Sequence, residues 1–487
     1  MTEKLIFEYS SPGRQGFSLP KCDVPEGKTE SLIPASLLRK SDSHLPEVSE
    51  NEVVRHFVRI STLNYHIDKG IYPLGSCSMK YNPKVNELAA GMPGWAEIHP
   101  LQPEESLQGA LQLMYDLRGL LAEIGGVDEV TLQPAAGAQG ELTGLLIAKA
   151  YHKKNKQAHR NKVIIPDSAH GSNPASVATA GYQSVQVKSD SNGLVDIDAL
   201  KSLVDDQTAA FMVTNPNTLG LFEKNITSIA EIVHKAGGLL YMDGANLNAL
   251  LGIVRPGDMG FDIVHFNLHK TFSTPHGGGG PGAGPIGVKA RLAEFLPVPQ
   301  VEKKSDSKGK IIYGWNWSKK ESIGKIHTFY GNFGMFVRAY TYIRQQGKEG
   351  LNAISENAVI NANYLLAGLK NHYNVPYNRP CMHELILTGS KQKAKGVRTA
   401  DLAKRLLDYG VHAPTVYFPL IVPEALMIEP TESESQESLD QFIQAMIKIS
   451  EEVDSDPDLV RSAPHTTPVS RLDEAKAARE LDVCFQG

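Results

Sequence analysis

The chain has 487 residues, 41% of them hydrophobic, and a formal net charge of −5. This length allows two or three domains with a substantial core. The mild charge and the lack of a basic block argue against nucleic acid as a partner, and no apolar run is long enough to span a membrane. The N-terminus lacks a signal-peptide core and is too acidic for a typical transit peptide. Four cysteines without metal-ligand spacing favour free thiols in a reducing cytoplasm and no metal site: Cys22, Cys77, Cys381 and Cys484.

Residues 1–75 are expected to form an N-terminal arm followed by a helix. Residues 1–50 are rich in proline, serine, glycine and charge, which favours an extended arm that wraps another surface. Ser49 and Glu52 have the spacing of a capping box, and apolar residues follow at helical intervals, so a helix should begin near Ser49.

A polar loop at residues 70–83 follows this helix. It holds a thiol, hydroxyl groups, a lysine and an amide within a few positions. Ser76, Ser78 and Lys80 are therefore candidates for a functional site, with an ordinary surface loop as the alternative.

A large α/β domain is expected over residues 76–335, and its first part contains a candidate anion site. A helix runs from about residue 105 to the glycines at 125–126, and a short strand follows at 129–133. The loop of small residues after this strand leads into a helix over 142–151. Free N–H groups at a helix start attract phosphate, so we assign Ala136, Gly137, Ala138 and Gln139 to an anion site, or alternatively to a tight packing turn.

Short apolar strands then alternate with helices, which predicts a mostly parallel sheet covered on both faces. The strands are expected at 162–166, 184–187, 209–213, 239–242 and 261–266, with helices at 196–204 and 226–236. In such sheets ligands bind at the carboxyl ends of the strands. Polar residues follow the strands at these ends, which predicts one shared site: His170, Asn215, Asp243 and Lys270.

The segment 264–284 carries the strongest chemical signal. Lys270 follows a short strand, lies between His269 and His276, and precedes a glycine run at 277–280. Glycine contributes no side chain to packing, so such a run indicates close backbone approach. A lysine in this setting suits a Schiff base with a carbonyl cofactor. A solvated lysine beside a flexible linker is the alternative.

Residues 336–487 are expected to form a smaller α+β domain with a polar tail from residue 454. Residues 301–314 look loose and charged. Helices are predicted at 335–344, 351–370, 399–409 and 439–453, with strands at 383–388, 417–422 and 425–428.

Together the candidate residues describe a pyridoxal 5′-phosphate pocket. Lys270 would form the imine, Asp243 would pair with the pyridinium nitrogen, and His170 would stack on the ring. Asn215 would bond the ring hydroxyl. Each residue has a structural alternative: Asp243 as a helix cap, His170 as a loop-stabilising group and Asn215 as the holder of its Asn-Pro turn.

Several motifs resemble the glycine cleavage system P-protein family, a group of fold-type I pyridoxal phosphate enzymes. They are Gln133-Pro-Ala-Ala-Gly-Ala-Gln-Gly-Glu, Ser168-Ala-His-Gly-Ser-Asn-Pro-Ala-Ser, Thr214-Asn-Pro-Asn-Thr-Leu-Gly, Met242-Asp-Gly-Ala-Asn and Asn267-Leu-His-Lys-Thr-Phe. The resemblance covers nearly the whole chain, including Arg14-Gln-Gly-Phe and Pro464-His-Thr-Thr. The chain is about half as long as a one-chain P-protein, and it looks like the cofactor-carrying second subunit of the split bacterial form.

The resemblance implies decarboxylation of glycine, with transfer of the aminomethyl group to the lipoyl group of an H-protein. It also implies a partner, subunit 1, in an α2β2 heterotetramer. His170 would also handle protons, and His269 and either Thr328 or Tyr330 would help with the phosphate, the latter two from a neighbouring subunit. The glycine end of the site or the carrier channel would be lined by Ser76, Ser78 and Lys80. The alternatives are another fold-type I reaction, such as amino-acid decarboxylation or transamination, and a non-catalytic structural subunit.

Overall fold

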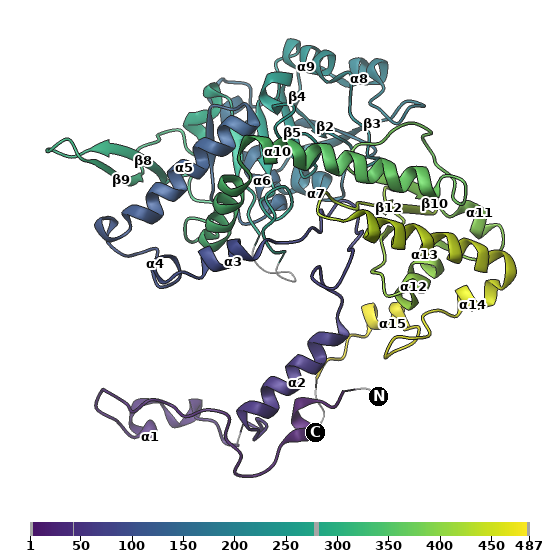
Figure 1. Cartoon of the computed structure of the whole chain (residues 1–487). Coiled ribbons are helices and arrows are strands. Elements are labelled where there is room, and N and C mark those ends of the chain that lie inside the picture. The colour runs from purple at the N-terminus through teal and green to yellow at the C-terminus, as the bar shows by residue number, and fades with distance from the viewer. Residues whose placement is uncertain (1–2, 42, 277–281, 485–487) are drawn as a thin grey trace. The chain divides into compact units, whose positions relative to one another are not determined.

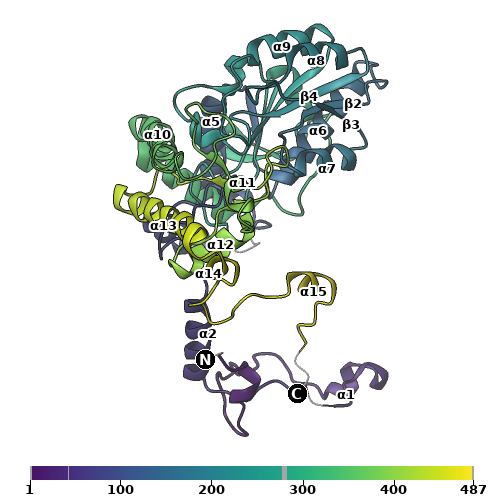
Figure 2. The same ribbon diagram turned by 90° about the vertical axis from the view of Figure 1, so that its right-hand side faces the viewer.

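The structure is a computed structural model that describes residues 3–41, 43–276 and 282–484 (Figures 1 and 2). Its chain divides into two compact units. One contains Gly70–Ser462, and the other combines Met1–Lys69 with Ala463–Gly487. The glycine run at 277–280 lies outside the described residues. The domain boundaries proposed at residues 75 and 335 remain predictions.

A seven-stranded sheet forms the centre of the larger unit, in the order β1-β7-β6-β5-β4-β2-β3. Strands β2 to β6 pair in parallel, and β7 pairs antiparallel with both β6 and β1. The mostly parallel sheet predicted from the alternation of strands and helices is confirmed. The strands are β1 (Glu129–Thr131), β2 (Lys162–Pro166), β3 (Gln183–Val187), β4 (Thr208–Thr214), β5 (Leu239–Gly244), β6 (Ile263–Phe266) and β7 (Ile286–Val288).

Helices cover both faces of this sheet, because its strands carry apolar side chains on both sides. One face packs against α5 (Gln108–Gly125), α8 (Ile197–Leu203) and α9 (Ile226–Lys235). The opposite face packs against α6 (Gly137–Lys154) and α7 (Ser172–Thr179). Residues of β2, β4, β5 and β6 therefore enter two separate hydrophobic clusters, one on each face.

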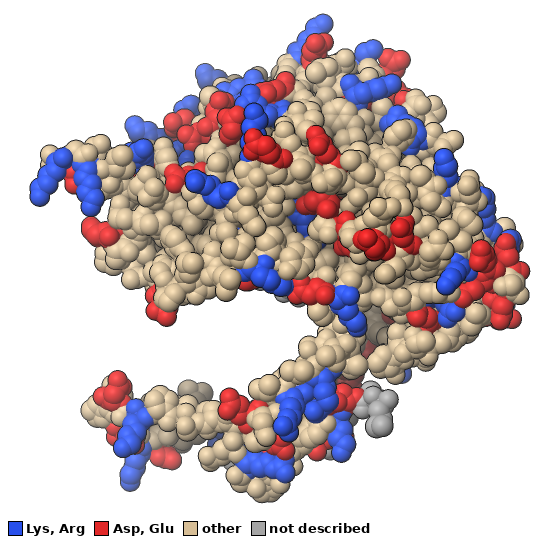
Figure 3. Space-filling view, viewed as in Figure 1, with Lys and Arg blue, Asp and Glu red and all other residues tan. Residues whose placement is uncertain are grey.

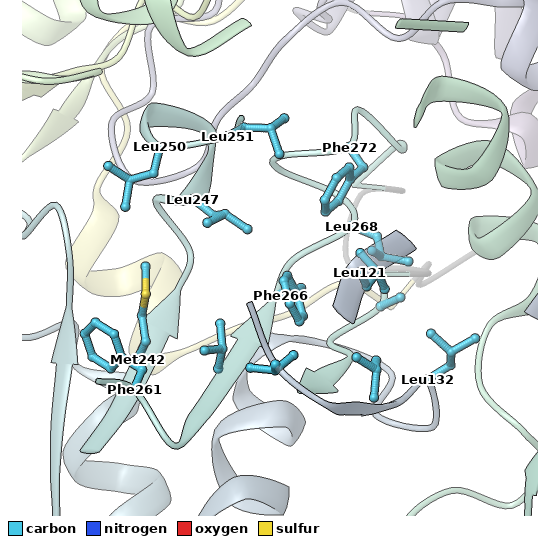
Figure 4. Close-up of a cluster of buried hydrophobic side chains, with 14 of the residues drawn as sticks. Leu121, Leu132, Met242, Leu247, Leu250, Leu251, Phe261, Phe266, Leu268 and Phe272 are labelled. Carbon is cyan, nitrogen blue, oxygen red and sulfur yellow. The ribbon is translucent and has the colours of Figure 1, made fainter. Parts of the chain in front are cut away.

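The larger cluster fixes the position of β6 and the loop that follows it. Phe266, Leu268 and Phe272 are fully buried here, on both sides of Lys270 in the sequence, and Figure 4 shows them beside Leu121 of α5. Because buried side chains are closely packed, this arrangement leaves the loop around Lys270 little freedom to move.

A smaller three-stranded antiparallel sheet has the order β10-β12-β11, with β10 at Leu385–Thr388, β11 at Thr415–Val416 and β12 at Ala425–Ile428. The helices α10 (Phe333–Leu369), α12 (Thr399–Asp408) and α13 (Gln436–Ser455) pack on it. The strand predicted at 417–422 is wrong. Tyr417 has a positive φ of 58°, and Pro419 has no N–H to donate to a sheet, so the strand ends at Val416.

The two helices predicted at 335–344 and 351–370 are confirmed, since α10 consists of two helical stretches separated at Gly347, where φ is 63° and ψ is −172°. One other expectation changes. The segment 301–314 is not loose, since β8 (Gln300–Ser305) and β9 (Ile311–Asn316) form a hairpin, which projects from the larger unit in Figure 1. The shorter helices of this unit are α3 (Lys84–Ala90), α4 (Pro93–Ala96), η3 (Glu104–Ser106), η4 (Leu247–Ala249), η5 (Pro256–Met259), η6 (Ala290–Phe295), α11 (Ser390–Lys393) and α14 (Pro457–Arg461).

The smaller unit contains α2 (Glu50–Leu63), which begins directly after Ser49 as predicted. The Ser49 hydroxyl and backbone N–H both donate to Glu52, at 2.7 and 2.9 Å, which confirms the capping box. Its other helices are short: η1 (Ile6–Tyr9), α1 (Thr29–Leu32), η2 (Ala35–Leu37) and α15 (Glu474–Arg479).

The surface agrees with the mild overall charge. On the face drawn in Figure 3, lysine and arginine are interspersed with aspartate and glutamate. Within the described residues, no helix combines the length and the apolar character that crossing a membrane requires.

Candidate active site

A cavity of about 210 Å³ lies where β2, β4, β5 and β6 end. Seven residues predicted for the site line this cavity: Ser76, Gly137, Ala138, His170, Asp243, His269 and Lys270. The expectation that polar residues after different strands would meet is therefore confirmed for His170, Asp243 and Lys270. The roles assigned to them remain predictions.

Asp243 lies near the end of β5 and is only 2% exposed. Its carboxylate accepts hydrogen bonds from Asn173 Nδ2 and from the Ala245 backbone N–H, both at 2.9 Å. His265 Nε2 lies 3.1 Å from the same carboxylate. Burial by itself would raise the pKa of Asp243, but His265, Asn173 and Ala245 together lower it below its ordinary value. The cavity thus contains a fixed carboxylate that stays ionised.

His265 was not identified from the sequence. The parallel pairing of β5 and β6 places it directly opposite Asp243. Its Nδ1 lies 3.1 Å from the Tyr241 hydroxyl, and its Nε2 lies 3.1 Å from Asn267 Nδ2. His265 therefore orients the Asp243 carboxylate. The contact between them depends on the register of β5 and β6 and not on a spacing along the sequence.

Lys270 enters the cavity from the loop after β6. Its Nζ donates a 2.8 Å hydrogen bond to the backbone carbonyl of Ser76. This contact joins two segments that are 194 positions apart in the sequence. The loop at residues 70–83 therefore reaches the same site as the lysine, as predicted for Ser76.

The N-terminus of α6 borders the cavity. This helix begins at Gly137 and not near residue 142, so the predicted anion loop is its first turn. A Cβ on Gly137 would lie 2.5 Å from Asn267 Oδ1, which explains the glycine. The Gln139 side chain accepts from Ala135 N–H and donates to the Ile326 carbonyl, so it holds the turn rather than lining the cavity. The positive end of the helix dipole favours an anion here.

His269 lies beside the lysine, with its ring 5.3 Å from that of His276. Burial, together with the nearby His276 and Lys270, lowers the pKa of His269 to about 3. Burial and Lys270 similarly lower the pKa of His276 to about 4. Both rings are therefore neutral near pH 7, and His269 can offer a phosphate a hydrogen bond but no charge.

This pKa predicts a pH dependence of stability. The unfolded chain binds a proton at His269 below about pH 6.5 while the folded chain does not, so stability should fall as the pH drops from 6.5 towards 3. His269→Gln should remove one proton from the difference in bound protons between the unfolded and folded chains. The slope of the unfolding free energy against pH should then decrease by up to about 1.4 kcal/mol per pH unit. Urea unfolding of the cofactor-free protein between pH 7 and pH 5 measures both slopes, and equal slopes would contradict the prediction.

His170 lies at the outer edge of the cavity and is exposed. Its Nδ1 is 2.8 Å from the Ser172 hydroxyl, which in turn donates to Glu141 Oε1 at 2.7 Å. The Phe418 ring lies 5.6 Å away, edge-on. These contacts hold the imidazole at the edge of the cavity, and its stacking on a ligand ring remains a prediction.

Six predicted residues do not line the cavity: Ala136, Gln139, Asn215, Thr328, Ser78 and Lys80. Asn215 Oδ1 instead accepts from Glu223 N–H, in agreement with its alternative role in the turn. The Lys80 ammonium is buried and donates to Glu432 at 2.6 Å and to the Thr271 carbonyl at 2.9 Å. Thr328 is exposed outside the cavity. The sequence gives no sign of the partners of Lys80, since Thr271 and Glu432 come from distant segments.

The cavity also contains residues that were not predicted. Thr214 Oγ1 and Asn246 Oδ1 are buried and have no hydrogen-bond partner among the described residues. Orphaned buried polar atoms in a cavity indicate a ligand with matching donors or acceptors. With the lysine, the ionised Asp243 and the helix N-terminus, they fit pyridoxal phosphate, which has an aldehyde, a basic ring nitrogen and a phosphate. The unpredicted lining residues are Glu141, Ser172, Thr214, Thr218, Ala245, Asn246, His265 and Asn267.

Two family models match the chain. The model described as "Aminotransferase class-V" matches residues 141–300, and the one described as "Glycine dehydrogenase, C-terminal domain" matches residues 354–465. Among solved structures, a glycine decarboxylase (P-protein) of the glycine cleavage system has a TM-score of 0.73 at 20% identity, covering 86% of this chain and 94% of that chain. At this identity the likeness shows the fold, which is the predicted fold-type I architecture.

Full-length relatives are considerably more similar. The "Probable glycine dehydrogenase (decarboxylating) subunit 2" of Chloroherpeton thalassium is 60% identical over 485 residues, covering 100% of this chain and 98% of the relative. The protein of the same name in Bacillus velezensis is 58% identical over 478 residues, covering 98% and 96%. Because this identity extends over the whole length of both proteins, the chain belongs to the family of glycine dehydrogenase (decarboxylating) subunit 2 proteins.

Proposed function

We propose that this chain binds pyridoxal 5′-phosphate and decarboxylates glycine, and that it passes the remaining aminomethyl group to the lipoyl group of an H-protein. One structural observation carries the proposal. A lysine from the end of β6 and an ionised aspartate from the end of β5 face the same cavity as the N-terminus of α6. The names of the full-length relatives support glycine as the substrate.

In this proposal, Lys270 holds the cofactor, the first turn of α6 at Gly137 and Ala138 binds its phosphate, and Asp243 faces its ring nitrogen. When bound, the cofactor accepts the electron pair that is released as the bond between Cα and the carboxylate breaks. The Asp243 carboxylate keeps a proton on the ring nitrogen, because the charge pair is buried and His265 and Asn173 prevent the carboxylate from turning away.

In this proposal, His170, which lines the cavity, contacts the ring face and exchanges protons. An imidazole can both donate and accept a proton, which suits this role. Ser172 and Glu141 position this ring through the contacts at its Nδ1.

The acceptor makes this reaction a redox process. Glycine loses its carboxyl group as CO2, and its methylene carbon forms a bond to one lipoyl sulfur. The lipoyl disulfide is reduced as the second sulfur becomes a thiol. Carbon oxidation and disulfide reduction balance, so this chain needs no dinucleotide site.

The relatives' name, subunit 2, implies a partner subunit. We propose that this partner is glycine dehydrogenase subunit 1 in an α2β2 heterotetramer, working in the cytoplasm with the H-protein. Thr328 lies outside the cavity of its own chain, so its proposed contact with the cofactor phosphate would have to be made across a subunit interface. The same holds for Tyr330. Ser78 and Lys80 contribute to the substrate end only through the loop that they anchor.

Exchange of labelled bicarbonate into the glycine carboxyl group tests the proposal. The assay contains this chain, subunit 1 and lipoylated H-protein, with each component omitted in turn and with Lys270→Ala as a control. Exchange should require all three components and Lys270. If the complete mixture shows no exchange although the chain binds the cofactor through Lys270, the reaction is another amino-acid conversion.

A further inference from the structure

The loop at residues 75–78 has an unusual backbone beside Lys270. Ser76 and Ser78 have φ values of 66° and 48°, in the left-handed region that residues with a side chain rarely adopt. Such a conformation persists only where the surroundings enforce it, and it is concentrated at functional sites. The contacts that enforce it here identify residues with no role in the function proposed above.

Two buried glutamates from the smaller sheet hold this loop. The backbone N–H of Ser76 donates to Glu384 Oε2 at 2.9 Å. The backbone N–H and the hydroxyl of Ser78 donate to Glu429 Oε2 and Oε1, at 2.9 and 2.6 Å. Glu384 immediately precedes β10 and Glu429 immediately follows β12. Because Leu385 pairs with Ile428, the two glutamates lie side by side, and both side chains are fully buried.

The backbone carbonyl of the same residue, Ser76, is the acceptor for Lys270 Nζ, at 2.8 Å. Ser76 alone therefore links Glu384 to Lys270, since its N–H binds the carboxyl group and its carbonyl binds the ammonium group. Gly75 adds to the restraint, since its carbonyl accepts from Thr415 Oγ1 at 2.9 Å and a Cβ would lie 2.1 Å from Met427 Cγ. The position of the lysine ammonium thus depends on the smaller sheet.

The two acids differ in their hydrogen bonding. Glu429 accepts from three donors, the N–H and the hydroxyl of Ser78 and Asn248 Nδ2, whereas Glu384 has Ser76 N–H and a long contact of 3.4 Å with Asn246 Nδ2. Burial, and then the charge of Glu429, raise the pKa of Glu384 well above its ordinary value. Burial also raises the pKa of Glu429, but Ser78, Lys270 and Asn248 oppose this rise.

Cys77, on the loop itself, and His383 are further titratable groups near the two acids, and burial raises the pKa of the Cys77 thiol. The ring nitrogens of His383 are buried without a hydrogen-bond partner among the described residues. Burial and Lys270 lower the pKa of His383 to about 3, so the ring adds no charge near neutral pH. Of the two acids, Glu384 therefore holds its proton more strongly, and Glu429, which accepts from three donors, ionises more readily.

We propose that Glu384 and Glu429 are positioning residues for Lys270. They hold the loop at 75–78 in its left-handed conformation, so that the Ser76 carbonyl fixes the place where Nζ meets the cofactor. This inference rests on the proposed function, in which Lys270 is the cofactor lysine. It assigns the smaller sheet a direct part in the site, although the large sheet supplies the lysine.

The different hydrogen bonding of the two acids gives a test with glutamine variants. Glu384→Gln should bind pyridoxal phosphate within about twofold of the wild type, because a neutral amide oxygen still accepts from Ser76. Glu429→Gln should weaken binding by roughly tenfold or more, because an amide offers one acceptor oxygen to the two donors of Ser78. Glu384→Ala should weaken pyridoxal phosphate binding to a similar extent, because the Ser76 N–H loses its acceptor.

Three measurements separate positioning from a general loss of stability. Absorbance titration of each folded variant with pyridoxal phosphate gives its dissociation constant. The pH midpoint of the bound cofactor's visible band reports the surroundings of Lys270 and should shift in Glu429→Gln but not in Glu384→Gln. Hydrogen exchange of the cofactor-free protein should accelerate at residues 74–79 in Glu429→Gln and Glu384→Ala.

Glu223→Gln is the matched control. Glu223 is also a buried glutamate that accepts two backbone N–H groups, but its donors, Val195 and Asn225, do not line the cavity. This variant should keep the wild-type affinity and midpoint. The inference would be overturned if Glu429→Gln and Glu384→Ala both kept the wild-type affinity for pyridoxal phosphate and the wild-type pH midpoint. If Glu384→Ala does not fold, equal affinities and midpoints in the two glutamine variants would overturn it. A visible band that survives in Lys270→Ala would instead refute the proposed cofactor lysine.

Discussion

Replacing Lys270 with alanine is expected to abolish the visible absorption band of bound pyridoxal phosphate and to lower glycine decarboxylation by roughly a thousandfold or more. The amine is the only group of the cavity's described lining that can hold the cofactor covalently and return a proton to it. Positioned proton transfer alone contributes about a hundredfold to ten-thousandfold in enzymes. Spectra of the purified variant after incubation with the cofactor, and its exchange of labelled bicarbonate, measure the two losses.

Lys149→Ala is the matched control for this experiment. Lys149 also donates to a backbone carbonyl, that of Ala180 at 2.8 Å, but it lies outside the cavity. Its variant should keep the absorption band and the exchange activity. An unchanged band in Lys270→Ala would show that another amine holds the cofactor.

Asp243→Asn is expected to lower kcat by roughly a hundredfold to a thousandfold while the protein still binds the cofactor. The amide keeps one acceptor oxygen but loses the charge that holds a proton on the ring nitrogen, and the loss of one preorganised electrostatic group typically has an effect of this size. A shift of the visible band together with the fall in kcat would locate the defect at the ring. A wild-type kcat would show that the ring nitrogen does not depend on this carboxylate.

Asp262→Asn separates the loss of this charge from the loss of any buried carboxylate. Asp262 is 4% exposed and lies next to the start of β6, where it contacts His234 and Arg291. Its variant should lose stability without shifting the cofactor band.

Because the pKa of Asp243 is lowered in the fold, its charge also stabilises the wild type above the ordinary aspartate pKa, and this contribution is lost as the pH falls through the lowered value.

The order of the elements was predictable because each depends on local patterns. Strands β2, β4, β5 and β6 are short apolar runs bounded by turn residues, and Ser49 with Glu52 marks the start of α2. The errors occurred where local patterns were ambiguous. Residues 417–422 are apolar enough for a strand but contain Pro419. The charged hairpin at 300–316 is stabilised by its own pairing and by the burial of Val301 and Tyr313 at its base.

The site was predictable in part for the same reason. Parallel strands place their carboxyl ends at one edge, so His170, Asp243 and Lys270 could be brought together from their sequence positions alone. Asn215 also follows a strand, but its side chain accepts a hydrogen bond from the Glu223 backbone, and the preceding residue, Thr214, lines the cavity instead. Which of two adjacent polar residues faces a ligand depends on the direction of the side chain and on its packing.

The sequence alone determined the α/β fold, the family resemblance and the lysine, because these depend on short motifs and on periodicity. The tertiary structure decided which groups surround that lysine. His265 is opposite Asp243 through strand register, and Ser76 reaches Lys270 from 194 positions away. Glu384 and Glu429 become neighbours only when β10 pairs with β12. Contacts of this kind arise from the burial of distant segments against one another, and a pattern along a single sequence does not record them.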